Sequence, residues 1–282
     1  LVRAGQSRGP LGEHTPGGRT VVLRADLIAA ETRDLLAAVA RVVLAARGGT
    51  LSEQLDRLAD DAPARLPLRR QAAALQPSPA LAAPDLEFFN GLGGFARDGQ
   101  EYVTLITPGQ LTPAPWINVI ANREFGFQVS ADGAGYTWRL NSRERQLTPW
   151  SNDPVSDPAG EAIYLRDDET GDLWSPTASP IRLDSGTYLA RHGRGYSRFE
   201  HSSHGLELEL LQFVPLLDSI KVSRLRVRNT SGRARRLSVT GYAEWVLGPS
   251  RAAAAPFTVT SIDDATGALF ARDQRRAGEG DE

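Results

Sequence analysis

The aromatic residues of this chain are confined to its C-terminal two-thirds, and this step in composition limits most strongly what the chain can fold into. All five Trp, six Tyr and nine Phe residues lie at or beyond Phe88, whereas the chain before about Ala83 is rich in Ala, Leu and Arg. Aromatic side chains bury large areas wherever they pack. We therefore expect residues 85–282 to form the main folded domain.

Residues 1–84 divide into three segments of different composition. Residues 1–20 carry scattered Gly, Pro and Arg, which predicts disorder or a linker. Residues 21–62 are predicted to form a short helical segment. The many Pro and Ala residues of 63–84 predict a second linker, which joins the helical segment to the main domain.

Two short helices are expected in the helical segment. Over residues 27–46 apolar residues recur at intervals of three and four, which places them on one helical face. The pair Gly48-Gly49 is expected to end this helix. Thr50 and Glu53 then form a capping-box pattern that predicts the start of a second helix.

From residue 86 onward the hydrophobic period changes to two. Leucines alternate with Glu207 and Glu209 over residues 206–210, which predicts a strand with one buried and one solvated face. The run 221–228 and the alternating stretch 237–247 predict two further strands.

Turn residues separate these strands. The segment 229–232 (Asn-Thr-Ser-Gly) has the chemistry of a four-residue hairpin joining the last two of them, and similar turns are predicted at 131–135, 167–171 and 263–267. Short strands at close spacing, with no long helix between them, predict a mainly β fold. We expect an antiparallel β-sandwich preceded by two short α-helices.

The composition excludes several classes of function. A net charge of −2 lacks the basic surplus that nucleic-acid binding needs. The absence of Cys excludes disulfides, thiolate catalysis and cysteine-ligated metals. No apolar run is long enough to cross a bilayer, so we expect no direct membrane insertion by this chain. Because the chain begins at Leu1 and contains no Met, we expect it to be a fragment of a longer protein.

The sequence contains none of the common catalytic motifs: no Walker phosphate loop, no Gly-x-Ser-x-Gly elbow and no His-Glu-x-x-His. The glycine-rich stretch 91–94 precedes a predicted strand rather than a helix, which favours a tight turn. His201 and His204 are three residues apart, but no recognised metal-ligand spacing includes them, and we predict no metal site.

Trp150, Asn152 and Asp153 form one candidate carbohydrate-binding group. An aromatic ring can stack on the apolar C–H face of a sugar while amide and carboxylate groups bind its hydroxyls. The alternative is that Trp150 belongs to the hydrophobic core, where most aromatic residues of a β domain lie.

Arg191, His192 and Tyr196 form a second candidate group. They belong to the sequence Arg-His-Gly-Arg-Gly-Tyr, in which two glycines flank an arginine and indicate a tightly shaped loop. Such a loop can face a ligand or a neighbouring domain. The alternative is a structural turn whose His and Tyr satisfy buried backbone groups.

Several motifs occur in an order that resembles one enzyme family. They are the stretches 86–95, 113–122, 147–153, 191–196 and 242–247. Together they resemble the N-terminal β-sandwich of glycoside hydrolase family 94, the glycan phosphorylases formerly classed as glycosyltransferase family 36. The resemblance is strongest to the C-terminal module of cyclic β-1,2-glucan synthases, and residues 22–58 also resemble the segment that precedes it there.

The resemblance implies a fold and a set of site residues. The fold is an antiparallel β-supersandwich of the galactose mutarotase-like type, here expected to lack its last strands because residues after Ala271 depart from the family pattern. Trp116 and Asn118, in the second motif, join the candidate carbohydrate-binding residues. The family's catalytic acid and phosphate site lie on an (α/α)6 barrel, so we expect no catalytic residue in this chain.

The expected function follows from the resemblance. The parent enzyme is expected to be a glycosyltransferase or inverting glycoside phosphorylase that uses inorganic phosphate as co-substrate and no other cofactor. This chain alone is expected to be an inactive, non-catalytic portion that shapes the substrate cleft and the subunit contact. Its expected partners are a β-glucan oligosaccharide, the barrel and a second copy. A cytoplasmic location is expected, with the parent at the inner membrane.

Two other functions remain open from the residues. The chain can be a self-sufficient carbohydrate-binding module for β-glucan, or an assembly domain that dimerises without affinity for sugar. A subunit contact needs a patch of around 1,000 Å² or more, whereas a sugar needs only a small aromatic surface.

Overall fold

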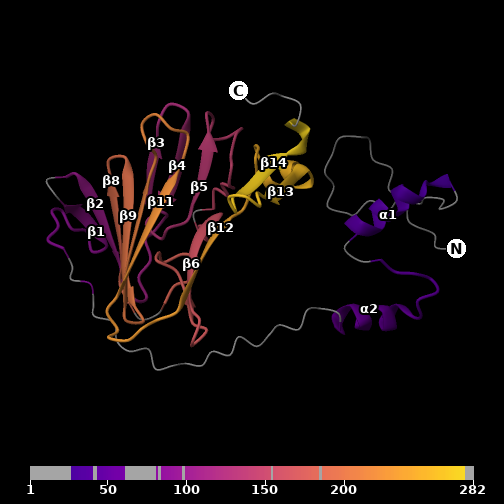
Figure 1. Ribbon diagram of the computed structural model, residues 1–282, viewed down its shortest axis with the longest axis horizontal. Coiled ribbons are helices and arrows are strands. Elements are labelled where there is room, and N and C mark those ends of the chain that lie inside the picture. Colours follow the sequence, from indigo (N-terminus) through magenta and orange to yellow (C-terminus); the bar gives the residue numbers. More distant parts are fainter. Residues whose placement is uncertain are drawn as a thin grey trace. The chain divides into compact units, whose positions relative to one another are not determined.

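The computed structural model describes residues 27–40, 43–60, 81, 84–96, 99–153, 155–183 and 186–276. The chain divides into two units, Leu1–Arg69 and Arg70–Glu282 (Figure 1). The predicted disordered segment 1–20 lies outside the described residues, as does nearly all of the predicted linker 63–84. None of the helices in the described ranges has the length and apolar character that a bilayer span requires.

The first unit contains two helices, α1 (Ala30–Val39) and α2 (Leu51–Asp60). The predicted capping box starts α2. The Thr50 backbone N–H donates to Glu53 Oε2 at 2.7 Å, and the Glu53 N–H donates to Thr50 Oγ1 at 3.3 Å. These two reciprocal hydrogen bonds confirm the prediction for the second helix.

The prediction of a first helix over 27–46 was wrong about its length. Helix α1 ends at Val39, and Ala40 has extended backbone with φ −72° and ψ 133°. Gly49, with φ 97°, instead lies in the turn before α2. The reason is that no side chain of α1 is buried, so no packing energy extends the helix, and the β-branched Val39 and Val43 have low helix propensity.

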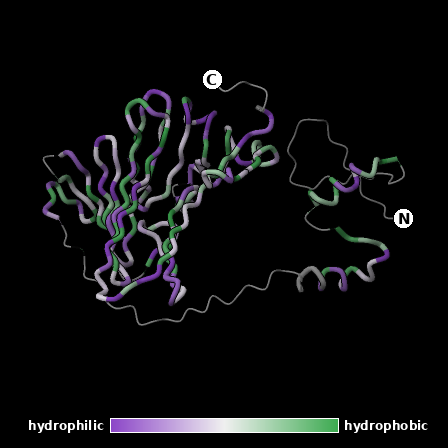
Figure 2. The backbone as a smooth tube through the Cα atoms, viewed as in Figure 1, coloured by the Kyte–Doolittle hydropathy of each residue, from purple (hydrophilic) through white to green (hydrophobic). Residues whose placement is uncertain are grey.

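The second unit is built on a six-stranded antiparallel sheet with the order β1-β2-β8-β9-β10-β11 (Figure 1). Hydrophobic and hydrophilic residues both occur along its strands (Figure 2), and they alternate over the first half of β10. In β10 the three leucines of the predicted alternation are at most 3% exposed, whereas Glu207 lies on the solvent face. The strands are β1 (Gly93–Ala96), β2 (Glu101–Ile106), β8 (Tyr188–Gly193), β9 (Tyr196–Ser203), β10 (Leu206–Phe213) and β11 (Val222–Asn229).

Two three-stranded antiparallel sheets form the second layer, in the orders β3-β4-β5 and β12-β6-β7. Phe127 of β4 packs against Phe199 and Leu210 of the six-stranded sheet in the main core. Leu165 and Trp174 pack against the other end of β10 in a second core. The strands are β3 (Ile117–Ala121), β4 (Phe125–Ser130), β5 (Gly135–Arg139), β6 (Glu161–Asp167), β7 (Leu173–Trp174) and β12 (Leu237–Ala243).

This packing of two antiparallel layers around shared cores confirms the predicted mainly β sandwich. The described chain closes with a small hairpin, in which β13 pairs only with β14. The remaining elements are α3 (Arg251–Ala254), η2 (Ala255–Phe257), β13 (Thr258–Ile262), β14 (Leu269–Asp273) and η3 (Gln274–Arg276).

Three of the predicted turns are confirmed. Gly133 adopts φ 96° between β4 and β5. The Gly171 N–H donates to the Asp167 carbonyl at 2.8 Å between β6 and β7, and the Gly267 N–H donates to the Asp263 carbonyl at 2.7 Å between β13 and β14. The chain turns before β1 as predicted, with Gly91 at φ 97°, but Gly93 and Gly94 of the glycine-rich stretch already belong to the strand.

The prediction of a hairpin at 229–232 was wrong. β11 pairs along its whole length with β10, while β12 pairs with β6 in the other layer. The Thr230 N–H donates to the Gly205 carbonyl at 2.9 Å and fixes the turn against the β9–β10 connection. The segment therefore carries the chain between layers, because turn residues that suit a hairpin suit a crossover equally well.

The strand predicted over 237–247 is also shorter than expected. β12 ends at Ala243, and Leu247 adopts φ 51°, which an extended strand does not allow. Val246, which belongs to the opposite face of the predicted alternation, is the buried residue of this stretch at 1% exposed.

A largely buried carboxylate connects three segments of the second layer. Glu161 accepts hydrogen bonds from the Thr137 and Thr148 hydroxyls at 2.6 and 2.5 Å and pairs with Lys221 Nζ at 2.5 Å. The Lys221 ammonium also lies 4.3 Å above the centre of the Phe127 ring. Burial alone would raise the pKa of Glu161, but Lys221 and the hydroxyls outweigh it and hold this pKa below its usual value.

We predict that Lys221→Met lowers the free energy of unfolding by about 3 kcal/mol, because the Glu161 carboxylate then stays buried without a counter-charge. Urea unfolding near neutral pH measures this change. The control is Arg228→Met, which removes a solvent-exposed partner of Glu207 and should cost less than about 1 kcal/mol. Equal losses in the two variants would contradict the role of the buried pair.

Candidate functional site

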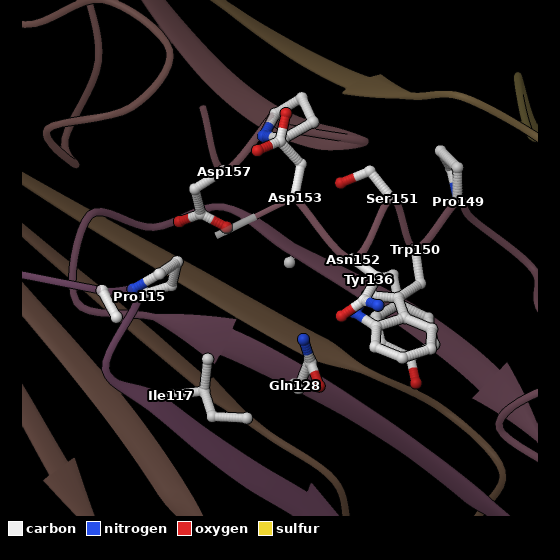
Figure 3. Close-up of a pocket in the computed structure, with 13 residues that line it drawn as sticks. Pro115, Ile117, Gln128, Tyr136, Pro149, Trp150, Ser151, Asn152, Asp153 and Asp157 are labelled. Carbon is white, nitrogen blue, oxygen red and sulfur yellow. The ribbon is translucent and has the colours of Figure 1, made fainter. Parts of the chain in front are cut away.

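A pocket of about 250 Å³ lies where the loop 149–158 covers the outer face of the β3-β4-β5 sheet. Its position follows from strand alternation. Phe127 and Val129 point into the core, so Gln128 between them points to the opposite face. Figure 3 shows Trp150 and Tyr136 on one side of the pocket, Asp157 on the other and Gln128 between them.

Trp150 forms an aromatic wall of this pocket. Its ring stacks on Tyr136 with centroids 5.8 Å apart and an interplanar angle of 22°, and Tyr136 in turn contacts Trp138 at 5.1 Å. The Trp150 backbone N–H donates to Gln146 Oε1 at 3.0 Å, which fixes the start of the loop. Because the Trp150 side chain is 45% exposed, it is a surface platform rather than a core residue.

Asn152 and Asp153 line the same pocket and shape its loop. Asn152 adopts the left-handed conformation, φ 49°. The Asp153 carboxylate accepts hydrogen bonds from the backbone N–H groups of Val155 and Ser156 and from the Ser156 hydroxyl. The Ser156 hydrogen bonds hold the pKa of Asp153 below its usual value, so this carboxylate is ionised at neutral pH.

Asp157 was missed by the sequence analysis, although it lines the pocket. Its Oδ2 atom is enclosed. Burial raises the pKa of Asp157, and the nearby Ser130 hydroxyl offsets only part of this effect. A ligand cannot reach this enclosed oxygen, so Asp157 serves the pocket as part of its wall. No sequence pattern singles out Asp157, because carboxylates are common in this chain and its position in the pocket depends on the fold.

Trp116, Asn118 and His192 lie elsewhere, between the two layers. Asn118 Nδ2 donates to the carbonyls of Gly193 and Tyr196 at 3.0 and 2.9 Å, so it ties β3 to the β8–β9 hairpin. His192 Nε2 lies 3.3 Å from the Trp116 carbonyl, and its Nδ1 lies 2.9 Å from the Ser197 hydroxyl. Burial lowers the pKa of His192 to about 4.

Arg191 and Tyr196 point to a third location, the outer face of the six-stranded sheet. Consecutive strand residues point to opposite faces, so Arg191 cannot share a face with His192. The Tyr196 hydroxyl donates to Glu101 Oε1 at 2.5 Å. Arg191 Nε donates to Glu200 Oε1 at 2.8 Å, and its Nη1 lies 3.5 Å from Glu101 Oε2. The eight candidate residues thus occupy three places, and only Trp150, Asn152 and Asp153 share a pocket.

The two histidines considered as metal ligands have aromatic neighbours instead. The His201 ring stacks on Tyr188 with centroids 3.8 Å apart, and the His204 ring stacks on Trp174 at 4.3 Å. Within the part of the chain that the structure describes, no group of three or more His, Cys, Asp or Glu side chains is arranged to hold a metal ion.

Comparison with known proteins identifies the family. The family model described as "Glycosyl hydrolase 94, supersandwich domain" matches residues 100–282. This chain belongs to that family. The match gives the two-layered fold its family name, the supersandwich, as the sequence motifs predicted.

Similar proteins are glycan-processing enzymes. The chain is 43% identical over 267 residues to the cyclic beta-(1,2)-glucan synthase NdvB of Rhizobium meliloti (strain 1021), covering 91% of this chain and 9% of that protein. It is 36% identical over 155 residues to the N,N'-diacetylchitobiose phosphorylase of Vibrio furnissii, covering 54% and 19%. The solabiose phosphorylase of Paenibacillus borealis is 28% identical over 164 residues, covering 56% and 20%. The chain therefore spans a fifth or less of the length of these relatives.

The buried histidines predict a pH-dependent stability. The folded-state pKa of both His192 and His201 is about 4, below the ordinary 6.5, so the unfolded chain binds more protons between these values. The free energy of unfolding should therefore fall as pH is lowered from about 6.5 to about 4, by up to about 1.4 kcal/mol per pH unit for each histidine.

Urea unfolding at a series of pH values tests this prediction. The variant His192→Asn should show a shallower loss than the natural chain, and the double variant with His201→Asn a shallower loss still. Identical slopes in all three proteins would show that these histidines do not control acid stability.

Proposed function

We propose that this chain is the non-catalytic β-sandwich portion of a glucan-processing enzyme, and that its Trp150 pocket contacts one ring of the glucan. The observation that carries the proposal is the half-exposed Trp150 ring, which shares one pocket with the Asn152 amide and the Asp153 carboxylate. The ring suits the C–H face of a pyranose, and the amide and carboxylate suit its hydroxyls. A volume of about 250 Å³ lies below the range of ordinary ligand pockets and suits a single sugar unit.

The proposed substrate is a β-1,2-linked glucan, because a cyclic beta-(1,2)-glucan synthase is among the relatives. The chemical step, with inorganic phosphate as co-substrate, is assigned to an (α/α)6 barrel of the parent enzyme, and no catalytic residue is assigned to this chain. Following the same resemblance, we place the module on the cytoplasmic side of a parent at the inner membrane.

We predict that the chain binds β-1,2-linked glucose oligosaccharides weakly, with a Kd on the order of millimolar, because one pocket wall supplies few contacts. Trp150→Ala should weaken this binding roughly tenfold, since it removes the stacking surface. Isothermal titration calorimetry measures both values. The matched control is Trp245→Ala, which removes another partly exposed tryptophan outside the pocket and should leave binding unchanged.

The same titration separates the alternative functions. A Kd in the micromolar range that is lost in Trp150→Ala would identify a self-sufficient carbohydrate-binding module instead of a cleft wall. Unchanged binding in Trp150→Ala would contradict the proposal that the Trp150 pocket contacts the glucan.

We also propose that the apolar side chains of the β13–β14 hairpin contact another subunit of the parent enzyme. Ile262 and Leu269 are cross-strand partners that are 64% and 69% exposed, and Phe270 beside Leu269 is 46% exposed. Exposed apolar residues gathered on paired strands commonly mark protein contacts.

We predict that the chain self-associates through this hairpin. The double variant Ile262→Glu, Leu269→Glu should shift the monomer–dimer equilibrium toward monomer at least roughly tenfold, because it places two charges in the contact. Sedimentation velocity over a concentration range measures the shift. The control is Leu216→Glu, Leu217→Glu, which changes two exposed apolar residues outside these strands. A natural chain that is monomeric at every concentration would contradict this role.

A further inference from the structure

A second groove lies on the outer face of the six-stranded sheet, across β9, β10 and β11, with a volume of about 540 Å³. Leu211 and Phe213 form its floor, because they alternate with the core-facing leucines of β10. Leu211 lies opposite Arg198 of β9 on one side and Arg224 of β11 on the other. An arginine therefore stands at each side of an apolar floor.

The arginines on the β9 side are already neutralised. Arg198 Nε lies 3.2 Å from Glu200 Oε1, and its Nη2 lies 3.7 Å from Glu101 Oε1. Arg191 joins the same network, and the Glu101 side chain is fully enclosed. Two guanidinium groups thus balance two carboxylates, so this side of the groove offers no net charge to a ligand.

The arginines on the β11 side share a single carboxylate. Arg224 Nη2 and Arg226 Nη1 lie 3.5 and 3.8 Å from the same Oε1 atom of Glu209. Their side chains are 56% and 67% exposed. Both distances exceed those of strong charge-assisted hydrogen bonds. One carboxylate cannot neutralise two guanidinium groups, so a positive charge and several N–H donors remain on this side.

We propose that this groove binds a sugar phosphate monoester. The phosphate lies between Arg224 and Arg226, and the apolar face of the sugar ring lies on Leu211 and Phe213. The site is independent of the Trp150 pocket, which is on the outer face of the other layer.

The geometry favours a phosphate over a carboxylate. Arg224 and Arg226 are two residues apart on one strand, so their Cα atoms are about 7 Å apart. A single arginine fork satisfies both oxygens of a carboxylate, whereas the three terminal oxygens of a phosphate can engage two guanidinium groups at once. The apolar floor adds nothing to the binding of free phosphate, but it can cover the C–H face of a pyranose.

Isothermal titration of the whole chain with α-D-glucose 1-phosphate tests the proposal, at about pH 7.5 where the phosphate carries close to two charges. Arg224→Gln, Arg226→Gln should weaken binding roughly tenfold or more, because the charge-assisted hydrogen bonds are lost. The matched control is Arg228→Gln, on the same strand and face but paired with Glu207 and outside the groove. It should change affinity by less than roughly twofold.

Glu209→Gln gives a test in the opposite direction. This variant releases Arg224 and Arg226 from their shared carboxylate, so it should strengthen binding of glucose 1-phosphate roughly fivefold. A merely structural role for Glu209 would not produce tighter binding.

Glucose and inorganic phosphate serve as the two comparison probes, and each should bind at least roughly tenfold more weakly than glucose 1-phosphate. Equal affinity for inorganic phosphate would overturn the role of the apolar floor and with it the sugar. No binding of glucose 1-phosphate, or equal binding by the Arg224→Gln, Arg226→Gln variant, would overturn the site. Thermal melts followed by circular dichroism establish that each variant is folded.

Discussion

The Glu161 carboxylate is the contact on which the pocket geometry depends. Its two hydroxyl partners, Thr137 and Thr148, are the neighbours of the aromatic wall: Thr137 follows Tyr136 on β5, and Thr148 precedes the loop that begins at Pro149. The Thr137 N–H also donates to the Thr148 hydroxyl at 2.8 Å. One ionised group therefore sets the distance between the strand and the loop that carry the stacked rings. Lys221 makes this arrangement stable by supplying the opposite charge.

Much of the fold follows from local sequence pattern. The leucine–glutamate alternation of β10, the glycine turns and the capping box of α2 depend on residues close in sequence, and the structure has them as predicted. The strand that pairs with β11 could not be predicted from local pattern, because the turn at 229–232 is compatible with either a hairpin or a crossover. The predicted length of α1 was wrong for a related reason. Periodicity indicates that a helix has an apolar face, but not whether another part of the chain covers that face.

The residues of the candidate site also fall into those that the sequence predicts and those that it does not. The chemistry of Trp150, Asn152 and Asp153 could be read from adjacent residues, and these three share the pocket. Grouping Arg191 with His192 ignored the pleat of the strand, which sends them to opposite faces. Tyr136 and Asp157 reach the pocket only through packing between distant segments. Their roles depend on tertiary contacts that no short motif records.

The order of strands in the six-stranded sheet has a consequence for folding during synthesis on the ribosome. β2 pairs with β8, so the backbone groups along one edge of β2 have no strand partner until the whole of β3–β7 has been translated. One edge of β6 likewise has no strand partner until β12 has been translated. Such long-range pairing makes folding slow. It also leaves unpaired backbone N–H and C=O groups exposed in the nascent polypeptide, where they can pair with other chains and aggregate. A chaperone that shields β2 and β6 during translation would act where this topology is most vulnerable.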